Sequence, residues 1–262
     1  MKVGLLISTY NWPEALELIL QSALMQTQLP HEILIADDGS KAETKQLIAL
    51  FQQNYLIPIR YFWQEDRGFR KSKILNKAIA ATTVDYIVQV DGDCIMHPKF
   101  IEDHIDFARK GVYLYGSRVN ISPDFVTKVF EYKKIKFNFF SKEIKNRTRT
   151  LHFPFFSKLY KSHEGISKKF RGCNVSFWRE DFISINGYNE DYEGWGREDS
   201  DLAIRLGNNG IKARRLRYSG IVYHIHHKIN SKHNFEWNDK MQNETILEKT
   251  VVIKNGIDKY LI

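Results

Sequence analysis

Two carboxylates, Asp91 and Asp93, are the residues of this sequence most suited to chemistry. They directly follow the apolar run 86–90, which delivers them to the end of a buried strand. Burying a carboxylate costs free energy unless a positive charge meets it. A pair of them suits a hard divalent cation such as Mg²⁺ or Mn²⁺, and Mg²⁺ is commonly shared with phosphate oxygens. The pair therefore predicts a metal site for a phosphorylated ligand, and the simpler alternative is an acidic turn around Gly92.

Two other groups of residues could also do chemistry. Glu198 and Asp199 open a predicted helix, where the positive end of the helix dipole favours carboxylates, although an ordinary acidic first turn has the same sequence. His224, His226 and His227 stand at the end of a predicted strand. Nitrogen ligands added to carboxylates suit Mn²⁺. Alternation along the strand sends His224 and His226 to one face, if the strand extends that far.

The elements that position these residues alternate between strand and helix. The apolar spacing predicts strands at 2–7, 32–36, 57–63 and 85–90, and helices at 14–25, 44–54 and 71–81. This alternation indicates an α/β fold with a mostly parallel sheet flanked by helices on both faces. Ligands of such sheets bind beyond the carboxyl ends of the strands. Four polar clusters follow that rule, at 9–11, 37–39, 66–68 and 91–93.

The second half of the chain is less regular. A helix at 98–110 and a strand at 111–119 are followed by a basic, aromatic stretch without clean periodicity. Further strands are predicted at 174–178, 211–216 and 220–224, and helices at 199–208 and 237–247. We expect residues 1–119 and 120–262 to form two halves of one domain, the second half carrying an insertion at 128–171.

Composition points to a globular chain with one localised charged segment. The 262 residues are 43% hydrophobic and 13% aromatic, which is enough for a core. The net charge is +8, yet residues 128–171 alone hold 13 Lys and Arg against 3 acidic residues. A single basic segment on a near-neutral body indicates a local docking patch rather than a general affinity for nucleic acid.

The basic segment is interleaved with phenylalanines, namely Phe137, Phe139, Phe140, Phe153, Phe155 and Phe156. Basic and aromatic residues together suit an anionic membrane surface, and they also suit nucleic acid. An ordinary insertion with inward-facing phenylalanines is the simpler alternative. We favour docking to an anionic inner leaflet or to a phosphorylated glycolipid, and we expect no nucleic-acid partner.

The termini and the cysteines favour a cytoplasmic setting. Residues 1–8 are too short for a secretory signal, and no apolar stretch approaches the roughly 18 residues of a membrane span. Cys94 and Cys173 are well separated and do not form a disulfide framework. We therefore expect a cytoplasmic protein, peripheral on the inner face of the membrane at most.

Six short stretches carry a resemblance to a known family by their order and spacing: 8–11, 36–40, 65–70, 91–93, 187–190 and 194–199. The chain resembles a nucleotide-sugar glycosyltransferase of the GT-A fold (a Rossmann-like α/β fold) in family 2. Its C-terminal half is similar to the galactosyltransferase-type segment of chondroitin-synthase-like and β-1,4-galactosyltransferase-like enzymes. The resemblance spans about residues 1–227, and it implies that the C-terminal half binds the acceptor.

The resemblance also implies a set of donor-binding residues: Thr9, Tyr10, Asn11, Asp38, Asp66, Arg70, Asp91 and Trp195. The first four would hold the nucleotide base and ribose. Arg70 suits a diphosphate because its planar fork can bond two oxygens. Trp195 would form a wall against a sugar ring.

In the metal site that the resemblance implies, Asp93 binds Mn²⁺ or Mg²⁺, and Asp91 contacts ribose or the metal. The ion neutralises the diphosphate as it leaves. In similar enzymes a histidine at the end of strand 220–224 completes the site, which favours His224, with His226 or His227 as the alternative.

For catalysis, the family comparison makes Asp199 the general base for the acceptor hydroxyl, with Glu198 orienting donor or acceptor. Arg197 and Ser200 differ from the residues of the galactosyltransferase motif, so the identity of the transferred sugar is not inferred from the resemblance. Because Asp199 is the one evident base, we expect the reaction to invert the anomeric configuration. We expect a UDP-sugar as donor and a hydroxyl of a surface glycan or glycolipid as acceptor.

Two rival functions were weighed. A sugar-phosphate nucleotidyltransferase shares the sheet and the acidic site, but it usually needs a glycine-rich, basic loop after the first strand, where this chain has residues 8–13. A non-catalytic anion-binding or glycan-binding module explains neither acidic pair.

Overall fold

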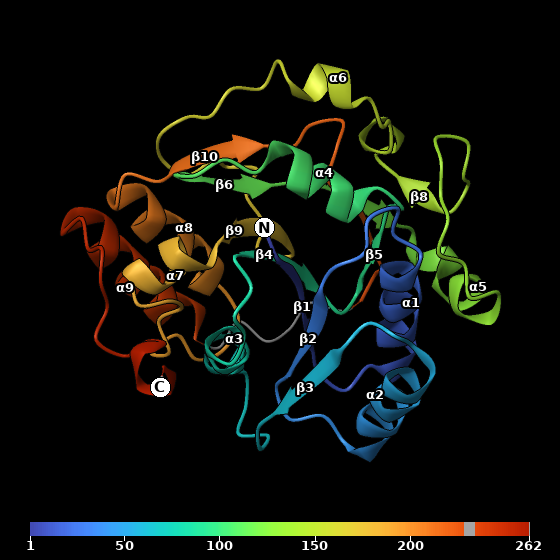
Figure 1. Cartoon of the computed structure of the whole chain (residues 1–262), viewed down its shortest axis with the longest axis horizontal. Coiled ribbons are helices and arrows are strands. Elements are labelled where there is room, and N and C mark those ends of the chain that lie inside the picture. Colours follow the sequence, from blue (N-terminus) through green and yellow to red (C-terminus); the bar gives the residue numbers. More distant parts are fainter. Residues whose placement is uncertain (228–233, 262) are drawn as a thin grey trace.

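The computed structural model describes residues 1–227 and 234–261, and the strands of this part form two β-sheets (Figure 1). The larger sheet has the order β10-β6-β9-β4-β1-β2-β3. Its strands are β1 (Val3–Thr9), β2 (Glu32–Asp37), β3 (Ile59–Trp63), β4 (Tyr86–Asp91), β6 (Val112–Tyr115), β9 (Asn174–Trp178) and β10 (Lys212–Arg215). Only β9 runs antiparallel to its neighbours, β4 and β6. The predicted mostly parallel sheet is therefore confirmed.

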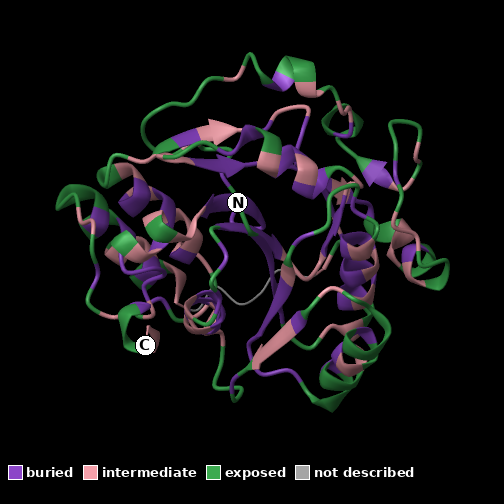
Figure 2. Cartoon of the chain, viewed as in Figure 1, coloured by how far each residue is buried: buried purple, intermediate pink, exposed green. Residues whose placement is uncertain are grey.

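Helices cover both faces of this sheet because its strands are apolar on both sides. On β1, Leu5 and Ile7 belong to one core cluster, and Leu6 belongs to the other. The first cluster lies under α1 (Pro13–Leu24) and α2 (Ala42–Asn54). The second lies under α3 (Lys71–Ala80), α7 (Arg179–Ser184) and α8 (Glu198–Asn208). Figure 2 shows the buried strands between these two groups of helices.

A smaller sheet of order β5-β11-β7-β8 lies beside the larger one. Its strands are β5 (Cys94–Met96), β7 (Ser117–Ile121), β8 (Ile144–Lys145) and β11 (Ile221–His224). The single strand expected at 111–119 is wrong, because the chain leaves the larger sheet after β6 and enters the smaller one at β7. The break falls at Gly116, where a Cβ would lie 2.1 Å from the Gly220 carbonyl oxygen. Only glycine allows the two sheets to meet so closely.

The remaining helices are α4 (Phe100–Phe107), α5 (Val126–Glu131), α6 (Pro154–Ser157) and α9 (Phe235–Leu247), with 3₁₀ turns at Pro123–Phe125, Arg147–Arg149 and Asp258–Tyr260. The predicted helix 98–110 is thus shorter than expected. None of the helices in the described part is long and apolar enough to cross a membrane.

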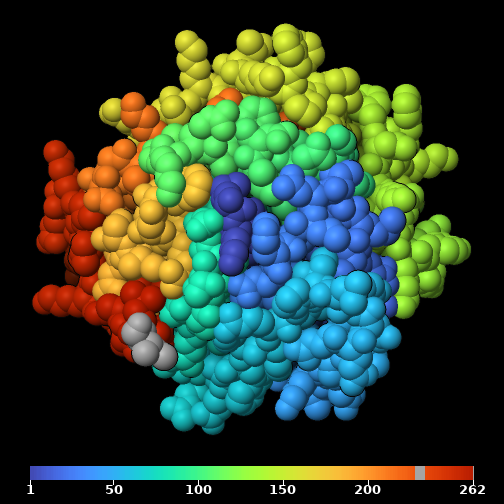
Figure 3. All heavy atoms as spheres, in the orientation of Figure 1, coloured from blue at the N-terminus to red at the C-terminus, as the bar shows by residue number. Residues whose placement is uncertain are grey.

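The basic segment 128–171 forms short elements along the rim of the molecule, where Figure 3 shows its green-yellow and yellow atoms on the outside. Of its phenylalanines, Phe137 is buried against Tyr223, with ring centroids 4.9 Å apart. Phe170, near the end of the segment, is also buried and packs against Tyr113 and Tyr115. Phe139, Phe140, Phe153, Phe155 and Phe156 are exposed. The inward-facing alternative therefore holds for Phe137 and Phe170 but not for these five.

A buried ion pair anchors α8. Arg205 and Asp201 are both fully buried, with Nε and Oδ2 2.7 Å apart. Arg205 also donates to the carbonyl oxygens of Ile185 and Gly187, at 2.9 and 2.8 Å. Asp201 accepts from the Thr245 hydroxyl of α9 at 2.9 Å. The network ties α8 to the loop before it and to α9, so the start of α8 is held in a defined place.

We expect Arg205→Ala to lower the free energy of unfolding by about 3–5 kcal/mol, because it leaves the Asp201 carboxylate buried without a cation. Urea denaturation followed by circular dichroism measures this loss. The matched control is Arg60→Ala, since the Arg60–Glu32 pair is 3.5 Å apart with 41% of the Arg60 side chain exposed. The control should cost less than about 1 kcal/mol. Equal losses in the two variants would contradict the anchoring role.

Candidate active site

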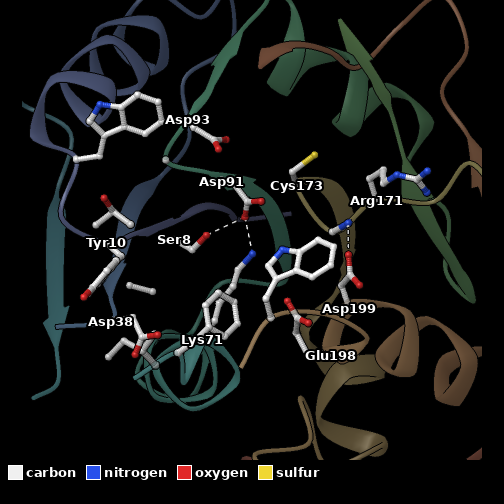
Figure 4. A pocket seen from close by; sticks show the side chains of 18 of the residues that line it. Ser8, Tyr10, Asp38, Lys71, Asp91, Asp93, Arg171, Cys173, Glu198 and Asp199 are labelled. Atoms are coloured by element: carbon white, nitrogen blue, oxygen red, sulfur yellow. Dashed lines mark hydrogen bonds and ion pairs between the residues drawn. The ribbon is translucent and has the colours of Figure 1, made fainter. Parts of the chain in front are cut away.

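A pocket of about 310 Å³ opens beyond the carboxyl ends of β1, β2 and β4, and is closed on its other side by the start of α8 (Figure 4). Nine of the predicted site residues line it: Thr9, Tyr10, Asp38, Asp91, Asp93, Trp195, Glu198, Asp199 and His227. Residues more than 100 positions apart in the sequence therefore meet at one sheet edge.

The Asp91-Gly92-Asp93 turn crosses from the larger sheet to the smaller one. Asp91 is the last residue of β4, and Asp93 directly precedes β5. The Gly92 amide donates to the Ser8 carbonyl at 2.7 Å, and a Cβ on Gly92 would lie only 2.7 Å from the same oxygen. Because of this turn, the two carboxylates have different neighbours.

Asp91 is bound by two side chains of the pocket floor. Its Oδ1 accepts from the Ser8 hydroxyl at 2.8 Å and from the Lys71 ammonium at 2.6 Å. The larger sheet sets this contact, since Ser8 and Asp91 are register partners on β1 and β4. Burial alone would lower the pKa of Lys71, but the charge of Asp91 outweighs it and raises the pKa above its ordinary value. Asp91 thus forms an ion pair with Lys71 and is not part of the histidine cluster.

Asp93 meets two histidines instead. Its Oδ2 lies 3.3 Å from His224 Nε2 and 3.1 Å from His227 Nε2. Antiparallel pairing of β5 with β11 places His224 opposite Cys94, and the Ile225 amide donates to the Asp93 carbonyl at 2.8 Å. Burial by itself raises the pKa of Asp93, but hydrogen bonds from His224 and His227 hold the pKa below its ordinary value.

Strand β11 ends at His224, so the alternation expected to bring His226 to the same face does not apply. His226 is exposed, and the chain after the strand turns His227 back toward Asp93. One carboxylate oxygen and two imidazole nitrogens lie within 4.8 Å of one another in this cluster. Such a donor set fits a borderline cation such as Mn²⁺ better than Mg²⁺, which prefers oxygen ligands only.

Asp199 is held by backbone amides on the opposite wall. Its Oδ2 accepts from Gly172 N–H at 2.6 Å, and its Oδ1 accepts from Ser200 N–H at 2.7 Å. A Cβ on Gly172 would lie 2.6 Å from the same carboxylate oxygen, so only glycine fits there. Each carboxylate oxygen has a further lone pair, and Asp199 can therefore still accept a proton from a ligand.

Glu198 lies beside Asp199 and is only 7% exposed. Its Oε2 is buried and has no hydrogen-bond partner among the described residues. Burial and the negative charge of Asp199 raise the pKa of Glu198 to about 7, against the opposing effect of Lys71. This carboxyl group is therefore the least compensated acid of the pocket.

The side of the pocket that the sequence predicts to hold the nucleotide is built around Asp38. This buried residue accepts from the Arg70 amide at 2.7 Å and from the Gln64 side chain at 2.6 Å. Burial raises the pKa of Asp38, despite these hydrogen bonds. The Tyr10 hydroxyl donates to Asp66 Oδ2 at 2.8 Å, which leaves the Tyr10 ring half-exposed at the pocket mouth.

Five predicted residues do not line the pocket: Asn11, Asp66, Arg70, His224 and His226. Asp66 touches the site through Tyr10, and His224 through Asp93. Asn11 accepts from the Lys41 amide at 2.9 Å, outside the pocket. Arg70 immediately precedes α3, and its guanidinium donates to the Glu65 carbonyl. The Arg70 side chain is thus bonded within its own loop here, and its contact with a diphosphate stays a prediction.

Trp195 lines the pocket from a glycine-flanked loop. Its ring stacks against Phe235 of α9, with centroids 6.2 Å apart and planes at 23°. Arg197 of the same loop lies over the Phe235 ring at 4.9 Å and pairs with Asp239. Helix α9 therefore holds this wall of the pocket in place.

The pocket is also lined by Lys71, Arg118, Arg171, Gly172 and Cys173, which no motif of the sequence marks as site residues. Lys71 lies on the pocket floor at the start of α3. Its helical spacing could have identified it, because Lys71 lies three and four residues before the buried Ile74 and Leu75. No local pattern marks Gly172, whose role depends on the approach of α8.

A family model described as "Glycosyl transferase family 2" matches residues 5–163, more than half of the chain. The chain belongs to glycosyltransferase family 2. A second model, "N-terminal domain of galactosyltransferase", matches residues 155–228, which covers the start of α8 and the histidines. The resemblance stated from the sequence is confirmed by these matches.

Curated relatives include a chondroitin synthase from Escherichia coli, 23% identical over 85% of this chain and 34% of the relative. A validoxylamine A glucosyltransferase from Streptomyces hygroscopicus subsp. limoneus is 25% identical over 80% of this chain and 48% of the relative. The family 2 chain thus spans between about a third and a half of the length of these two relatives.

Solved structures of similar fold include S. aureus TarS 1–349 in complex with UDP, with a TM-score of 0.62 and 15% identity over 100% of this chain and 70% of that one. The mannosyltransferase PcManGT from Pyrobaculum calidifontis, in complex with GDP-Man and Mn²⁺, has a TM-score of 0.61 and 17% identity over 99% and 68%. Likeness at this identity shows the fold alone, and it confirms the GT-A architecture.

We expect the stability of the family 2 chain to depend on the Glu198 carboxyl group. The ordinary pKa of this group is 4.5 and burial raises it to about 7, so the folded protein binds more protons than the unfolded chain between these values. Stability contributed by the protonated group is complete below the lower pKa and is lost as pH rises through the upper one. Glu198→Gln removes the ionisable group, so the variant does not lose this stability as pH rises.

The free energy of unfolding of Glu198→Gln, minus that of the wild type, should therefore grow by roughly 3 kcal/mol from pH 4 to pH 8. Urea denaturation at a series of pH values measures it. Glu65→Gln is the control, because Glu65 is exposed, and its difference from wild type should stay flat over the same range. A flat profile for Glu198→Gln would contradict the assignment.

Proposed function

We propose that this chain is a metal-dependent, inverting glycosyltransferase that moves a sugar from a nucleoside diphosphate donor, with a UDP-sugar as the first candidate, to a hydroxyl of a glycan or glycolipid. One observation carries the proposal. Asp93 and His227, which form a cluster with His224, line the same pocket as the amide-bound Asp199 on the opposite wall, so a donor held at the cluster would meet a base at Asp199.

Asp93, His224 and His227 would hold the divalent cation, and Mn²⁺ suits this oxygen and nitrogen donor set. When bound, the cation supplies positive charge to the diphosphate leaving group. Lys71 supplies a second positive charge at the pocket floor, where it also keeps Asp91 in place to accept a hydrogen bond from ribose. Thr9, Tyr10 and Asp38 would contact the base and ribose, with Trp195 against the sugar.

In the proposed reaction, the acceptor hydroxyl oxygen attacks the anomeric carbon of the donor. The new carbon–oxygen bond forms as the bond from that carbon to the diphosphate oxygen breaks, and the electron pair leaves with the diphosphate. The hydroxyl proton passes to the Asp199 carboxylate. A single displacement of this kind inverts the anomeric configuration. Gly172 acts as a positioning residue, because its N–H orients the base.

The relatives support this reaction class over the rivals. A nucleotidyltransferase or a non-catalytic module is not favoured, since the family match and the named relatives are glycosyltransferases and glycan synthases. Chondroitin synthase and hyaluronan synthase among the relatives support a glycan acceptor. We propose that the enzyme works in the cytoplasm, at the inner face of the membrane, on a growing surface glycan or glycolipid.

We expect thermal stabilisation by one family of nucleoside diphosphates only when Mn²⁺ is present. A ligand at about 100 times its dissociation constant should add roughly 2.7 kcal/mol of stability. A panel of UDP, GDP and their sugars, each with and without Mn²⁺, measures this by differential scanning fluorimetry. Asp93→Asn and His227→Ala should lose the Mn²⁺-dependent part.

The matched control for the metal site is His226→Ala, which removes an exposed histidine one position away and should behave as wild type. If UDP or GDP stabilises the protein equally without Mn²⁺, the metal assignment is wrong. If no nucleotide stabilises the folded protein, the donor assignment is wrong.

Asp199→Asn should reduce turnover at least a hundredfold, as expected for loss of a general base, while donor affinity changes little. Gly172→Ala should have a similar effect on turnover, because the added methyl group displaces the Asp199 carboxylate. Release of the nucleoside diphosphate measures turnover, and isothermal titration measures donor affinity. Asp258→Asn, at an exposed position in the last 3₁₀ turn, is the matched control. Full activity of Asp199→Asn would exclude it as the base.

A further inference from the structure

An exposed cluster of aromatic rings surrounds α6, at the top of Figure 1. We use the name α6 aromatic cluster for Phe153, Phe155, Phe156 and Tyr218. The Phe156 ring contacts the other three, with centroid distances of 6.2, 5.8 and 6.1 Å. Phe155 is 72% exposed, and the nearby Leu159 is 70% exposed. Single exposed apolar residues are ordinary, but a contiguous group of this kind marks an interaction surface.

The local backbone holds these rings outward. Ser157 is the buried residue of this single-turn helix, and its hydroxyl bonds the Ser219 hydroxyl at 2.8 Å. The Phe153 amide donates to the Tyr218 carbonyl at 2.9 Å. With Ser157 fixed on the inside, the preceding Phe155 and Phe156 project from the surface.

Positive charges surround the cluster. Phe155 borders a hollow of about 430 Å³ that is also lined by Arg109, Lys158 and Arg214, with Asp106 as its only acidic lining residue. None of the three cations forms an ion pair within the described part of the chain. Burial and the neighbouring charge of Arg109 lower the pKa of Arg214, which indicates cations that lack a carboxylate. Arg217 lies 4.4 Å from the Tyr218 ring centroid and extends the basic rim.

We propose that the α6 aromatic cluster and its basic rim dock this protein on an anionic lipid bilayer. Aromatic rings are favoured at the level of lipid headgroups, and each lysine or arginine near an anionic leaflet adds to the attraction. The hollow beside Phe155 offers three cations to a lipid phosphate. The rings pack edge-on against one another, at 72° and 76°, and form one apolar projection rather than separate stacking platforms for nucleic-acid bases.

Docking of this surface would hold the enzyme on the bilayer that carries a lipid-linked acceptor. The segment that carries α6 continues to Arg171 and Gly172, which line the pocket next to Asp199. This benefit rests on the proposed glycolipid acceptor, but docking itself does not depend on catalysis. The two proposals can therefore fail independently.

Co-sedimentation of the full chain with vesicles tests the docking. Phosphatidylcholine vesicles are compared with vesicles that contain phosphatidylglycerol, at low and high salt. We expect the protein to pellet with the anionic vesicles and to be released by high salt. Phe155→Ser should weaken partitioning several-fold by removing an inserted ring. Lys158→Glu should weaken it at least about fivefold, since it removes one cation and adds an acid.

Matched controls carry the same changes elsewhere on the surface. Leu56→Ser removes an exposed apolar side chain from the loop before β3, and Lys45→Glu reverses a charge on α2. Both should pellet as wild type, and all variants should keep the wild-type melting temperature and nucleotide response. No lipid-dependent pelleting at low salt, equal pelleting of Phe155→Ser and wild type, or binding to a DNA duplex that displaces the vesicles would overturn the proposal.

Discussion

Besides Asp38, four carboxylates line one pocket, from Asp91, Asp93, Glu198 and Asp199, and their mutual repulsion is the constraint that the surrounding structure satisfies. Each is compensated differently. Asp91 has the Lys71 ammonium, Asp93 has two histidines, and Asp199 has two backbone amides. Glu198 has the weakest compensation, which is why its pKa is raised to about 7. In the proposed enzyme, a divalent cation at Asp93, His224 and His227 would offset the negative charge of both the pocket and the donor.

The junction between the two sheets separates the roles of the acidic pair. Gly92 lies between the end of β4 and the start of β5, and its close contact with the Ser8 carbonyl allows no side chain. Asp91 consequently belongs to the floor formed by the larger sheet, whereas Asp93 belongs to the smaller sheet with β11. The same strand pairing that builds the smaller sheet therefore builds the candidate metal site.

The wall of the pocket that carries Asp199 depends on packing at a distance from the pocket. The buried Arg205–Asp201 pair holds α8 against the preceding loop and α9, and α9 also supports Trp195 through Phe235. Gly172 then meets Asp199 at a spacing that excludes a side chain. Stability of α8 and orientation of the Asp199 carboxylate are thus parts of one arrangement. Most of the basic segment lies outside this arrangement, since many of its rings and cations are exposed and its end, at Arg171, lines the pocket.

The sequence by itself determined the α/β architecture, the alternation of strands and helices over the first 91 residues, and the polar clusters at the strand ends, including Asp38, Asp91 and Asp93. These follow from local apolar periodicity and from the rule that parallel strands present their carboxyl ends at one edge. Family motifs added Glu198, Asp199 and Trp195, which line the same pocket.

Only the tertiary structure decided which histidines meet Asp93, that Lys71 is bound to Asp91, that Gly172 fixes Asp199, and that strand 111–119 is divided between two sheets. It also decided which phenylalanines are exposed. Each of these outcomes depends on contacts between residues far apart in the chain. Periodicity shows which face of an element is buried, but the partner that the face meets is set by strand register and by the close approach of backbones.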